Sequence, residues 1–307
     1  MKLTILGSSS ALPTSERFPS AHVLNVHERL FLIDCGEGTQ MQLRKCRIRI
    51  GKISHIFISH LHGDHVFGLY GLISTFSLMG RENPLYLYAP QNFREMLNSH
   101  LADFDIHVKF PIEFVALKGK NPVKIYDNKH ITVTSFPLKH RIDAFGFIFR
   151  EKPADRNIIK EAIAKYNIPT VRIPAIKKGE DFITGEGAVI PNEEITRAPA
   201  PPLSYAYCTD TRYFKRLAHF VKDVTLLYHE STFDKSLSEL ARITGHSTSV
   251  DAAITAREAH AKALIIGHFS ARYKDITFLV AEAAEIFPST LPAIDGTTYD
   301  ISEFSGT

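Results

Sequence analysis

The chain has 307 residues, of which 44% are hydrophobic, so it can bury the core of one large domain or two small ones. Its formal net charge of +3 tolerates a polyanionic partner without requiring one. No segment reaches the roughly 18 apolar residues of a membrane-spanning helix, and the first residues do not read as a signal peptide. The three cysteines form an odd, scattered set, which argues against a disulfide framework and predicts a reducing, cytoplasmic location.

Short apolar runs alternate with helical patterns along the chain. Strands are predicted, in order, at residues 3–6, 22–26, 30–33, 53–58, 85–89, 131–138, 145–149, 203–208, 224–228 and 263–267. Helices are predicted at residues 38–45, 66–78, 91–102, 157–166, 213–221, 234–242, 249–261 and 276–286. Two αβ halves of this kind favour an α/β sandwich of sheets covered by helices.

Residues 151–202 interrupt this alternation. They hold many chain-breaking residues and end in the run Pro199-Ala200-Pro201-Pro202, which is too broken for a core element. We therefore expect one domain spanning residues 1–307, with an arm inserted at about residues 151–202.

The densest group of metal-ligand residues follows the apolar run 53–58. His60, His62, Asp64 and His65 fall within six residues at the end of a predicted strand. His60 and His62 can reach one ion only if the chain turns there, and Gly63 is expected to supply the flexibility for the turn. Asp64 and His65 then lie at the start of the next helix, within reach of a second ion. Imidazole and carboxylate donors without thiolates suit zinc, manganese or iron(II), and a polar capping loop is the alternative interpretation.

Three more ligand-type residues also follow predicted strands. They are His140, Asp210 and His268. Functional groups of α/β sheets collect at the carboxyl ends of strands, so these residues could complete two coordination shells. Taken singly, each histidine could be structural and Asp210 could cap a helix; their joint occurrence with the first group favours metal binding.

These segments resemble the ribonuclease Z family of the metallo-β-lactamase superfamily nearly end to end. The core motif His60-Leu61-His62-Gly63-Asp64-His65 is common to lactamases, glyoxalases and nucleases. The nuclease is favoured by three later segments that resemble its substrate-side loops: His229-Glu230-Ser231-Thr232, Gly245-His246-Ser247-Thr248-Ser249 and His268-Phe269-Ser270-Ala271-Arg272-Tyr273.

The resemblance implies a four-layer αβ/βα fold and a zinc-dependent endoribonuclease that removes 3′ trailers from precursor tRNA. Two Zn²⁺ per chain are implied, with Mn²⁺ or another divalent metal possible in their place. The implied ligands are His60, His62 and His140 for one ion, Asp64, His65 and His268 for the other, and Asp210 bridging them. Asp64 is also implied as the group that orients the attacking water or takes its proton, and His246 as the residue that assists the leaving 3′-oxygen. A helix-capping role is the alternative for His246.

Five residues are expected to serve the substrate: Glu230, which could position His246, and Lys177, Lys178, Arg272 and Tyr273. The arm departs from the family pattern, because Val171-Arg172-Ile173-Pro174 stands where a Gly-Pro pair is expected. Residues 151–190 carry seven Lys or Arg and six Asp or Glu, so tRNA affinity would have to come from local clusters such as Lys177 and Lys178. An ordinary solvated loop is the alternative for this stretch. The family further implies a homodimer.

Two other functions fit the same motif. A metallo-phosphodiesterase or arylsulfatase acting on small substrates would not need the arm. A non-catalytic RNA-binding relative would be expected to have lost ligands, and this chain has lost none.

Overall fold

The computed structural model describes residues 1–306, which form two compact units. The larger unit, the body, comprises Met1–Asp127, Thr132–Arg150 and the chain from Leu203 onward. The smaller, the inserted unit, comprises Asn128–Ile131 and Glu151–Pro202. None of the helices in the described part of the chain is long and apolar enough to cross a membrane.

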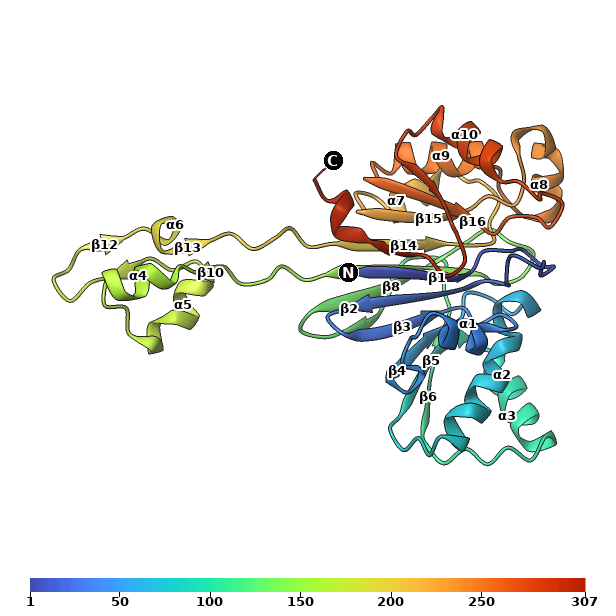
Figure 1. Cartoon of the computed structure of the whole chain (residues 1–307), viewed down its shortest axis with the longest axis horizontal. Helices are drawn as coiled ribbons and strands as arrows, with labels where there is room; N and C mark the ends of the chain where they lie inside the picture. The colour runs from blue at the N-terminus through green and yellow to red at the C-terminus, as the bar shows by residue number, and fades with distance from the viewer. Residues whose placement is uncertain (307) are drawn as a thin grey trace. The chain divides into compact units, whose positions relative to one another are not determined.

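The first half of the body is a seven-stranded mixed sheet (Figure 1). Its spatial order is β18 (Thr298–Asp300), β1 (Lys2–Gly7), β2 (Ala21–Val26), β3 (Arg29–Ile33), β4 (Ile53–Phe57), β5 (Leu85–Pro90) and β6 (Ile112–Leu117). Strands β3 to β6 run parallel, and the others are antiparallel. One face is covered by α1 (Thr39–Lys45), α2 (Gly63–Leu78) and α3 (Phe93–Asp103), which bury side chains such as Leu43, Leu69 and Leu97 against it.

A second seven-stranded sheet forms the other half. Its order is β17 (Thr290–Pro292), β16 (Ala263–Gly267), β15 (Leu226–Glu230), β14 (Ser204–Cys208), β9 (Phe145–Glu151), β8 (Ile131–Pro137) and β7 (Val123–Asp127). Strands β14 to β17 are parallel, and β14, β15 and β16 are buried, as their apolar runs predict. The helices of this half are α7 (Arg216–Phe220), α8 (Ser238–Thr244), α9 (Ser249–Glu258) and α10 (Thr277–Ala284). Short 3₁₀ helices lie at Ile50–Lys52, Lys235–Leu237 and Ile301–Phe304.

The two sheets pack face to face through aromatic side chains. Phe57 of β4 meets Phe147 and Phe149 of β9 with ring centroids 5.4 and 5.3 Å apart. The buried His22 of β2 makes a 2.9 Å hydrogen bond with the Tyr205 hydroxyl of β14. The predicted sandwich of two sheets covered by helices is therefore confirmed.

The inserted unit has a small core of its own, which the sequence analysis did not predict. Its elements are β10 (Asn157–Ile158), α4 (Lys160–Lys165), a 3₁₀ turn (Thr170–Arg172), α5 (Ile173–Lys177), β11 (Phe182–Ile183), β12 (Val189–Ile190), α6 (Asn192–Ile195) and β13 (Thr196–Arg197). They enclose Ala162, Ile168, Ile176, Phe182 and Ile195. The Asn192 side chain donates to the Ile176 and Glu180 carbonyls, which ties the short elements together.

Several element boundaries differ from the sequence prediction. Helix α2 begins at Gly63 rather than residue 66, and β15 extends to Glu230 rather than residue 228. The strand and short helix of residues 157–165 replace a single predicted helix. Strands β6, β7, β17 and β18 were not predicted; β6, β7 and β18 are partly exposed, so they lack a clear apolar run.

The start of α2 depends on a close backbone contact, which gives a first prediction. The Gly68 N–H donates to the Cys35 carbonyl, and a Cβ on Gly68 would lie 2.0 Å from the Gly36 carbonyl oxygen. Gly68→Ala should therefore lower the free energy of unfolding by about 1–3 kcal/mol, because a backbone atom cannot move aside. Urea denaturation would measure the change.

Gly51→Ala is the matched control, since a Cβ there meets no atom within 4 Å. Equal stability of the two variants would contradict the close contact.

Candidate metal centre

The His60-to-His65 segment joins the end of β4 to the first turn of α2. Its backbone is held by Asp34, whose carboxylate accepts hydrogen bonds from the Ser59 N–H at 2.7 Å and from Ser59 Oγ at 2.8 Å. His62 is the extended N-cap residue of α2, so Asp64 and His65 lie in the first turn of the helix. The segment therefore presents side chains from a strand end, a cap and a helix to one place.

Gly63 serves a different purpose from the predicted one. It is not among the residues with positive φ, so the turn does not need the conformational freedom of glycine. A Cβ on Gly63 would instead lie 2.2 Å from the Phe67 ring. A larger residue at position 63 would therefore have to displace the Phe67 ring, which lies close against the start of α2.

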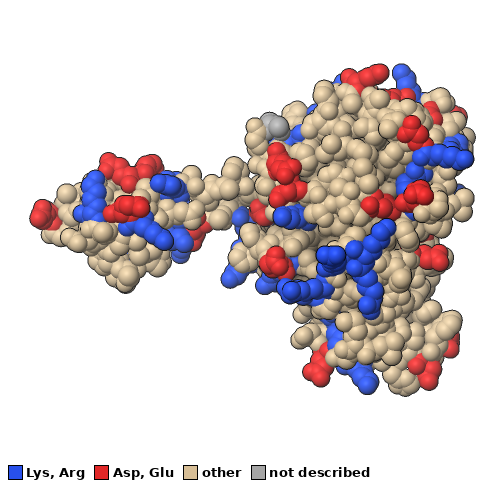
Figure 2. Space-filling view, viewed as in Figure 1, with Lys and Arg blue, Asp and Glu red and all other residues tan. Residues whose placement is uncertain are grey.

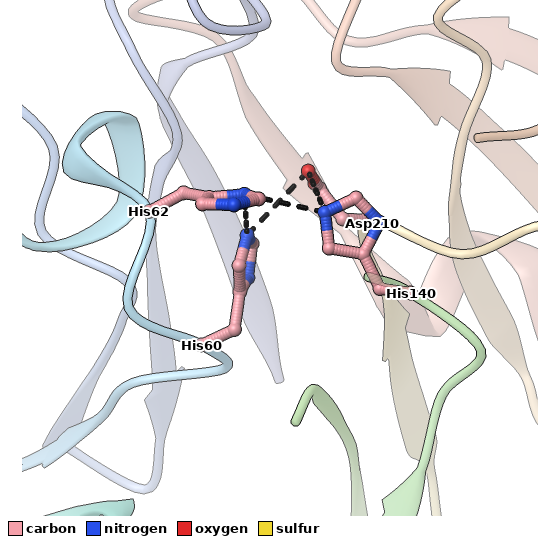
Figure 3. A group of neighbouring side chains, drawn as sticks. All are labelled: His60, His62, His140 and Asp210. Atoms are coloured by element: carbon pink, nitrogen blue, oxygen red, sulfur yellow. Dashed lines mark hydrogen bonds and ion pairs between the residues drawn. The ribbon is translucent and has the colours of Figure 1, made fainter. Parts of the chain in front are cut away.

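The first donor group brings together three imidazoles and one carboxylate. Figure 3 shows His60, His62, His140 and Asp210 pointing toward one another. His62 Nδ1 lies 3.1 Å from His60 Nε2 and 3.2 Å from His140 Nε2. Asp210 Oδ2 lies 3.5 Å from His60 Nε2 and 3.7 Å from His140 Nε2. One metal ion could contact all four atoms, since bonds from Zn²⁺ to nitrogen and oxygen are about 2 Å long.

The second donor group shares Asp210 with the first. His65 Nε2, His268 Nε2 and Asp64 Oδ2 lie 3.3–3.4 Å from one another. The other oxygen of Asp210, Oδ1, lies 3.2 Å from His65 Nε2 and 3.1 Å from His268 Nε2. Each carboxylate oxygen of Asp210 thus faces one donor group, which is the arrangement of a bridging ligand. The structure brings all seven predicted donors together.

Hydrogen bonds on the outer side fix the orientation of four imidazoles. The Nδ1 atoms of His60, His65, His140 and His268 lie 2.7–3.0 Å from Ser59 Oγ, Asp34 Oδ2, the Gly245 carbonyl and Thr232 Oγ1, respectively. Their Nε2 atoms therefore face the centre, as the ligand nitrogens of metal sites do. Each Nδ1 partner comes from a loop or strand end that packs beside its histidine.

Asp34 is the functional residue that the sequence analysis missed. It is fully buried and accepts hydrogen bonds from Ser59, from His65 Nδ1 and from the Tyr207 hydroxyl at 2.7 Å. It has φ of 56°, an uncommon conformation for a residue other than glycine. A lone carboxylate directly after the apolar strand β3 was the available signal in the sequence.

Burial and neighbouring charges together set the protonation of the donors, and the carboxylates of Asp64, Asp210 and Asp34 raise the pKa of His65 despite its burial. Burial lowers the pKa of His60 to about 4, so this imidazole is neutral near pH 7. Burial alone would raise the pKa of Asp210, but the imidazoles of His268, His65 and His60 hold it well below its usual value. Neutral imidazoles and ionised carboxylates are the donors that divalent zinc, manganese and iron take, so these residues fit a divalent metal centre.

His246 lies beside the donors, next to Glu230. Its Nδ1 is 3.0 Å from Glu230 Oε1 and 3.9 Å from Asp210 Oδ2. Glu230 is fully buried at the end of β15 and also accepts hydrogen bonds from the Thr211 N–H and Thr232 Oγ1. Burial alone would lower the pKa of His246, but the Glu230 carboxylate raises it to about 9. The side chain is therefore held as a proton donor in the absence of bound metal.

The capping alternative for His246 does not describe its position. Helix α9 is capped by Thr248, whose side chain accepts from the Asp251 N–H, while the Asp251 carboxylate accepts from the Thr248 N–H. His246 instead turns its ring toward Glu230 and lines the pocket above the donors.

This pocket has a volume of about 550 Å³. It is lined by Ser10, Ala11, Pro13, Pro19, Glu37, His62, Gly63, Asp64, Phe67, Arg141, Asp210, Thr232, Phe233, Thr244, His246, His268 and Ser270. None of the five predicted substrate residues is in this lining. Tyr273 is nearly buried, with its hydroxyl donating to Asp234 Oδ2, and the Arg272 guanidinium lies over the Phe233 ring at 5.0 Å. Lys177 and Lys178 lie at the end of α5 in the inserted unit.

The position of Asp34 gives a prediction about metal affinity. Asp34→Asn should weaken metal binding by about 10–100-fold, because an amide cannot accept every hydrogen bond that now fixes Ser59 and His65. Competition with a chelating dye would measure the affinity. Asp295→Asn is the control. This half-buried carboxylate also accepts two hydrogen bonds, from Ser8 and Phe18, but it has no hydrogen bond to a predicted metal ligand. Equal losses in both variants would contradict an orienting role for Asp34.

The chain is similar over its full length to proteins named ribonuclease Z. It is 45% identical over 306 residues to that of Bacteroides thetaiotaomicron, covering 100% of this chain and 97% of the relative. It is 41% identical over 297 residues to that of Porphyromonas gingivalis, covering 97% and 98%. The crystal structure of human tRNase Z, short form, matches with a TM-score of 0.72 and 26% identity, covering 98% of this chain and 99% of that one.

A family model described as anti-Pycsar protein Apyc1 matches residues 1–155, which include the His60-to-His65 motif. The metallo-β-lactamase fold protein YhfI of Bacillus subtilis has a TM-score of 0.68 at 18% identity, covering 97% of this chain and 98% of that one, and shares the fold. The predicted metallo-β-lactamase fold is thereby confirmed. By its full-length relatives the chain belongs to the ribonuclease Z family, and its first half, residues 1–155, also belongs to the family of the Apyc1 model.

Proposed function

We propose that the chain is an endoribonuclease that removes 3′ trailers from precursor tRNA. It would cut the phosphodiester after the discriminator nucleotide and leave a 3′-hydroxyl on the tRNA. The observation that carries this proposal is the shared carboxylate of Asp210, whose two oxygens face two donor groups. The full-length relatives named ribonuclease Z and the similar human tRNase Z support the choice of tRNA as the substrate.

Two Zn²⁺ ions per chain are proposed as the metals, with Mn²⁺ or another divalent ion able to replace them. His60, His62 and His140 would hold one ion, and Asp64, His65 and His268 the other, with Asp210 contacting both. Bound divalent cations activate water and stabilise the negative charge that develops on phosphoryl oxygens. The paired donor groups support this count because each offers at least three donor atoms within 4.8 Å of one another.

The acid and base roles fall to groups on either side of Asp210. Asp64, whose Oδ2 lies 3.4 Å from His65 Nε2, would orient the attacking water or accept its proton. His246 carries a proton toward the pocket and would give it to the leaving 3′-oxygen, while Glu230 holds its ring in place. The phosphate then stays on the trailer, and the tRNA keeps the hydroxyl.

The inserted unit is proposed to hold the tRNA away from the cut. Lys178 is exposed and Lys177 half-buried at the end of α5, while Arg172 lies 3.6 Å from Glu180 and is partly neutralised. Figure 2 shows both signs of charge on this unit, so any phosphate contact must be local. On the body, the same view shows Lys and Arg side chains gathered around α1, where Arg44 and Lys45 form the last turn.

We also propose that the chain forms a homodimer and that it is cytoplasmic. A homodimer is supported by exposed apolar side chains on the first half of the body, such as Met41 of α1 and Leu78 of α2, which a partner subunit could cover. A cytoplasmic location is supported by the three cysteines, all of which are free. Sedimentation of the purified chain would test the dimer.

Replacing His246 tests the acid role. His246→Ala should lower the single-turnover cleavage rate about 10²–10⁴-fold, the usual contribution of general acid catalysis, while metal content stays at two ions per chain. His219→Ala, on the exposed surface of α7, is the control and should cleave normally. A loss smaller than threefold would remove His246 from the mechanism, and one ion per fully loaded wild-type chain would refute the dinuclear proposal.

Removing the inserted unit separates tRNA processing from a second candidate function, hydrolysis of small phosphodiesters or aryl sulfates. That candidate is favoured by the Apyc1 family match, which covers the motif but almost none of the inserted unit. Arg150 and Ser204 are cross-strand partners on β9 and β14, so a two-residue turn can replace residues 152–202. This variant should lose precursor-tRNA processing because remote binding positions the scissile bond.

The same variant should hydrolyse bis(p-nitrophenyl) phosphate within a fewfold of wild type, since all seven donors lie in the body. Lys177→Ala with Lys178→Ala should reproduce part of the tRNA defect and reduce its salt dependence. Lys118→Ala with Lys120→Ala, in an exposed loop of the body, is the charge-matched control. Full tRNA processing by the shortened chain would favour the small-substrate function.

A further inference from the structure

Arg141 is the only Lys or Arg among the residues that line the metal pocket in the described structure. It directly follows the donor His140 and is exposed. No ion pair or hydrogen bond of its side chain is found in the part of the chain that the structure describes, residues 1–306. Its guanidinium is thus available to a ligand, beside a pocket that also presents Glu37, Asp64 and Asp210.

The backbone that carries Arg141 is fixed. The Lys139 N–H donates to Thr211 Oγ1 at 3.0 Å, and the Lys139 carbonyl accepts from the Arg212 N–H at 2.9 Å. Three residues before Arg141, the Leu138 N–H donates to the Ala144 carbonyl at 2.8 Å, which closes the loop. Arg141 therefore projects a free cation from a loop that is tied to the segment carrying Asp210.

Arg141 stands on the His246 side of the pocket. A Cβ on Gly245, the residue before His246, would lie 3.6 Å from Arg141 Cγ and 3.0 Å from His140 Nδ1. Gly245 has φ of 83° and ends α8, so its missing side chain leaves room for both neighbours. The Arg141 side chain thus packs against the loop that presents His246.

The chemical class of the ligand follows from the charge of Arg141 and from the direction of the proposed reaction. A guanidinium with five N–H donors matches the oxygens of a phosphate, and the proposed substrate is a chain of phosphates. If His246 assists the leaving 3′-oxygen, the nucleotide that carries this oxygen lies on the same side of the pocket as Arg141. Its other phosphate, on the 5′ side, is the next anion along the strand.

We propose that Arg141 binds the phosphate on the 5′ side of the nucleotide whose 3′ bond is cut. This assignment rests on the proposed function, because it takes its direction from the role of His246. Arg141 would hold the end of the tRNA in register with the donors, while the phosphate being attacked is left to the metal centre.

The test pairs variants with singly modified substrates. Precursor tRNAs would carry one neutral methylphosphonate, either at the phosphate 5′ to the discriminator nucleotide or at the first phosphate within the trailer. Arg141→Ala should lower single-turnover kcat/KM on the unmodified precursor roughly 10–100-fold, the usual effect of losing a hydrogen bond between charged groups. Arg141→Lys should restore part of this loss.

The modified substrates identify the phosphate. For wild type, the methylphosphonate on the 5′ side should cost about as much as the Arg141→Ala substitution, and the two losses should not add. The methylphosphonate in the trailer should add its full effect to that of the substitution. Additive losses at both positions would overturn the assignment.

Arg212→Ala is the matched control, since Arg212 is exposed, hydrogen-bonded through its backbone to Lys139 and absent from the pocket lining. It should change cleavage less than threefold. A loss equal to that of Arg141→Ala would show that Arg141 acts only through the general positive charge of this surface. It would contradict a specific phosphate site.

A small substrate separates this inference from the proposed function. If wild type fails to process precursor tRNA, the proposed function is refuted, but the phosphate site can still be examined with dinucleotides. Wild type should cleave a dinucleotide that bears a 5′-phosphate faster than one that lacks it, and Arg141→Ala should lose this preference. An equal rate on both dinucleotides with wild type would overturn the assignment by itself.

Discussion

The buried carboxylate of Asp34 is the interaction on which the metal centre depends. It accepts hydrogen bonds from Ser59 before the motif, from His65 in α2 and from Tyr207 in the opposite sheet. One side chain thereby ties a strand end, a helix start and the facing half of the sandwich together. A buried carboxylate left without such partners is strongly destabilising, so each partner must stay in place for the charge to be tolerated. Asp34 therefore couples the packing of the two sheets to the position of the donors.

The sequence predicted the donors because each lies where a recognisable strand ends. A strand end is a local feature, and parallel strands bring their carboxyl ends to the same edge, so His140, Asp210 and His268 could be grouped from the pattern alone. The role of Asp34 could not be predicted in this way, because its partners lie 25, 31 and 173 residues away along the chain. Gly63 shows the same limit, since the reason for a glycine there is the placement of the Phe67 ring.

The inserted unit shows why breaker residues are a weak guide to packing. Its prolines and glycines predicted a broken insertion, and the apolar side chains between them are too widely spaced to form a periodic pattern. Ile168, Ile176 and Ile195 meet only when turns bring short segments together, and the Asn192 side chain satisfies the backbone carbonyls that such turns leave open. Tyr273 shows a second limit. It was predicted to serve the substrate, but its hydroxyl donates a hydrogen bond to Asp234, because a position in a loop does not fix the direction of a side chain.

The carboxylates and imidazoles of the pocket serve metal binding and catalysis, whereas Arg141 serves to align the substrate. Carboxylates lie among the imidazoles on the floor of the pocket, and bound divalent cations would add the positive charge that attracts an RNA strand. Metal ions bind any phosphate that reaches them and do not distinguish one phosphate of the strand from the next, so other groups must select the bond that is cut. A single free guanidinium at the rim, one residue from a donor, can set the register of the strand because it takes one phosphate at a fixed distance from the centre. Losing Arg141 should therefore affect not only the rate but the site of cleavage, and sequencing of the products of Arg141→Ala should show cuts displaced by a nucleotide.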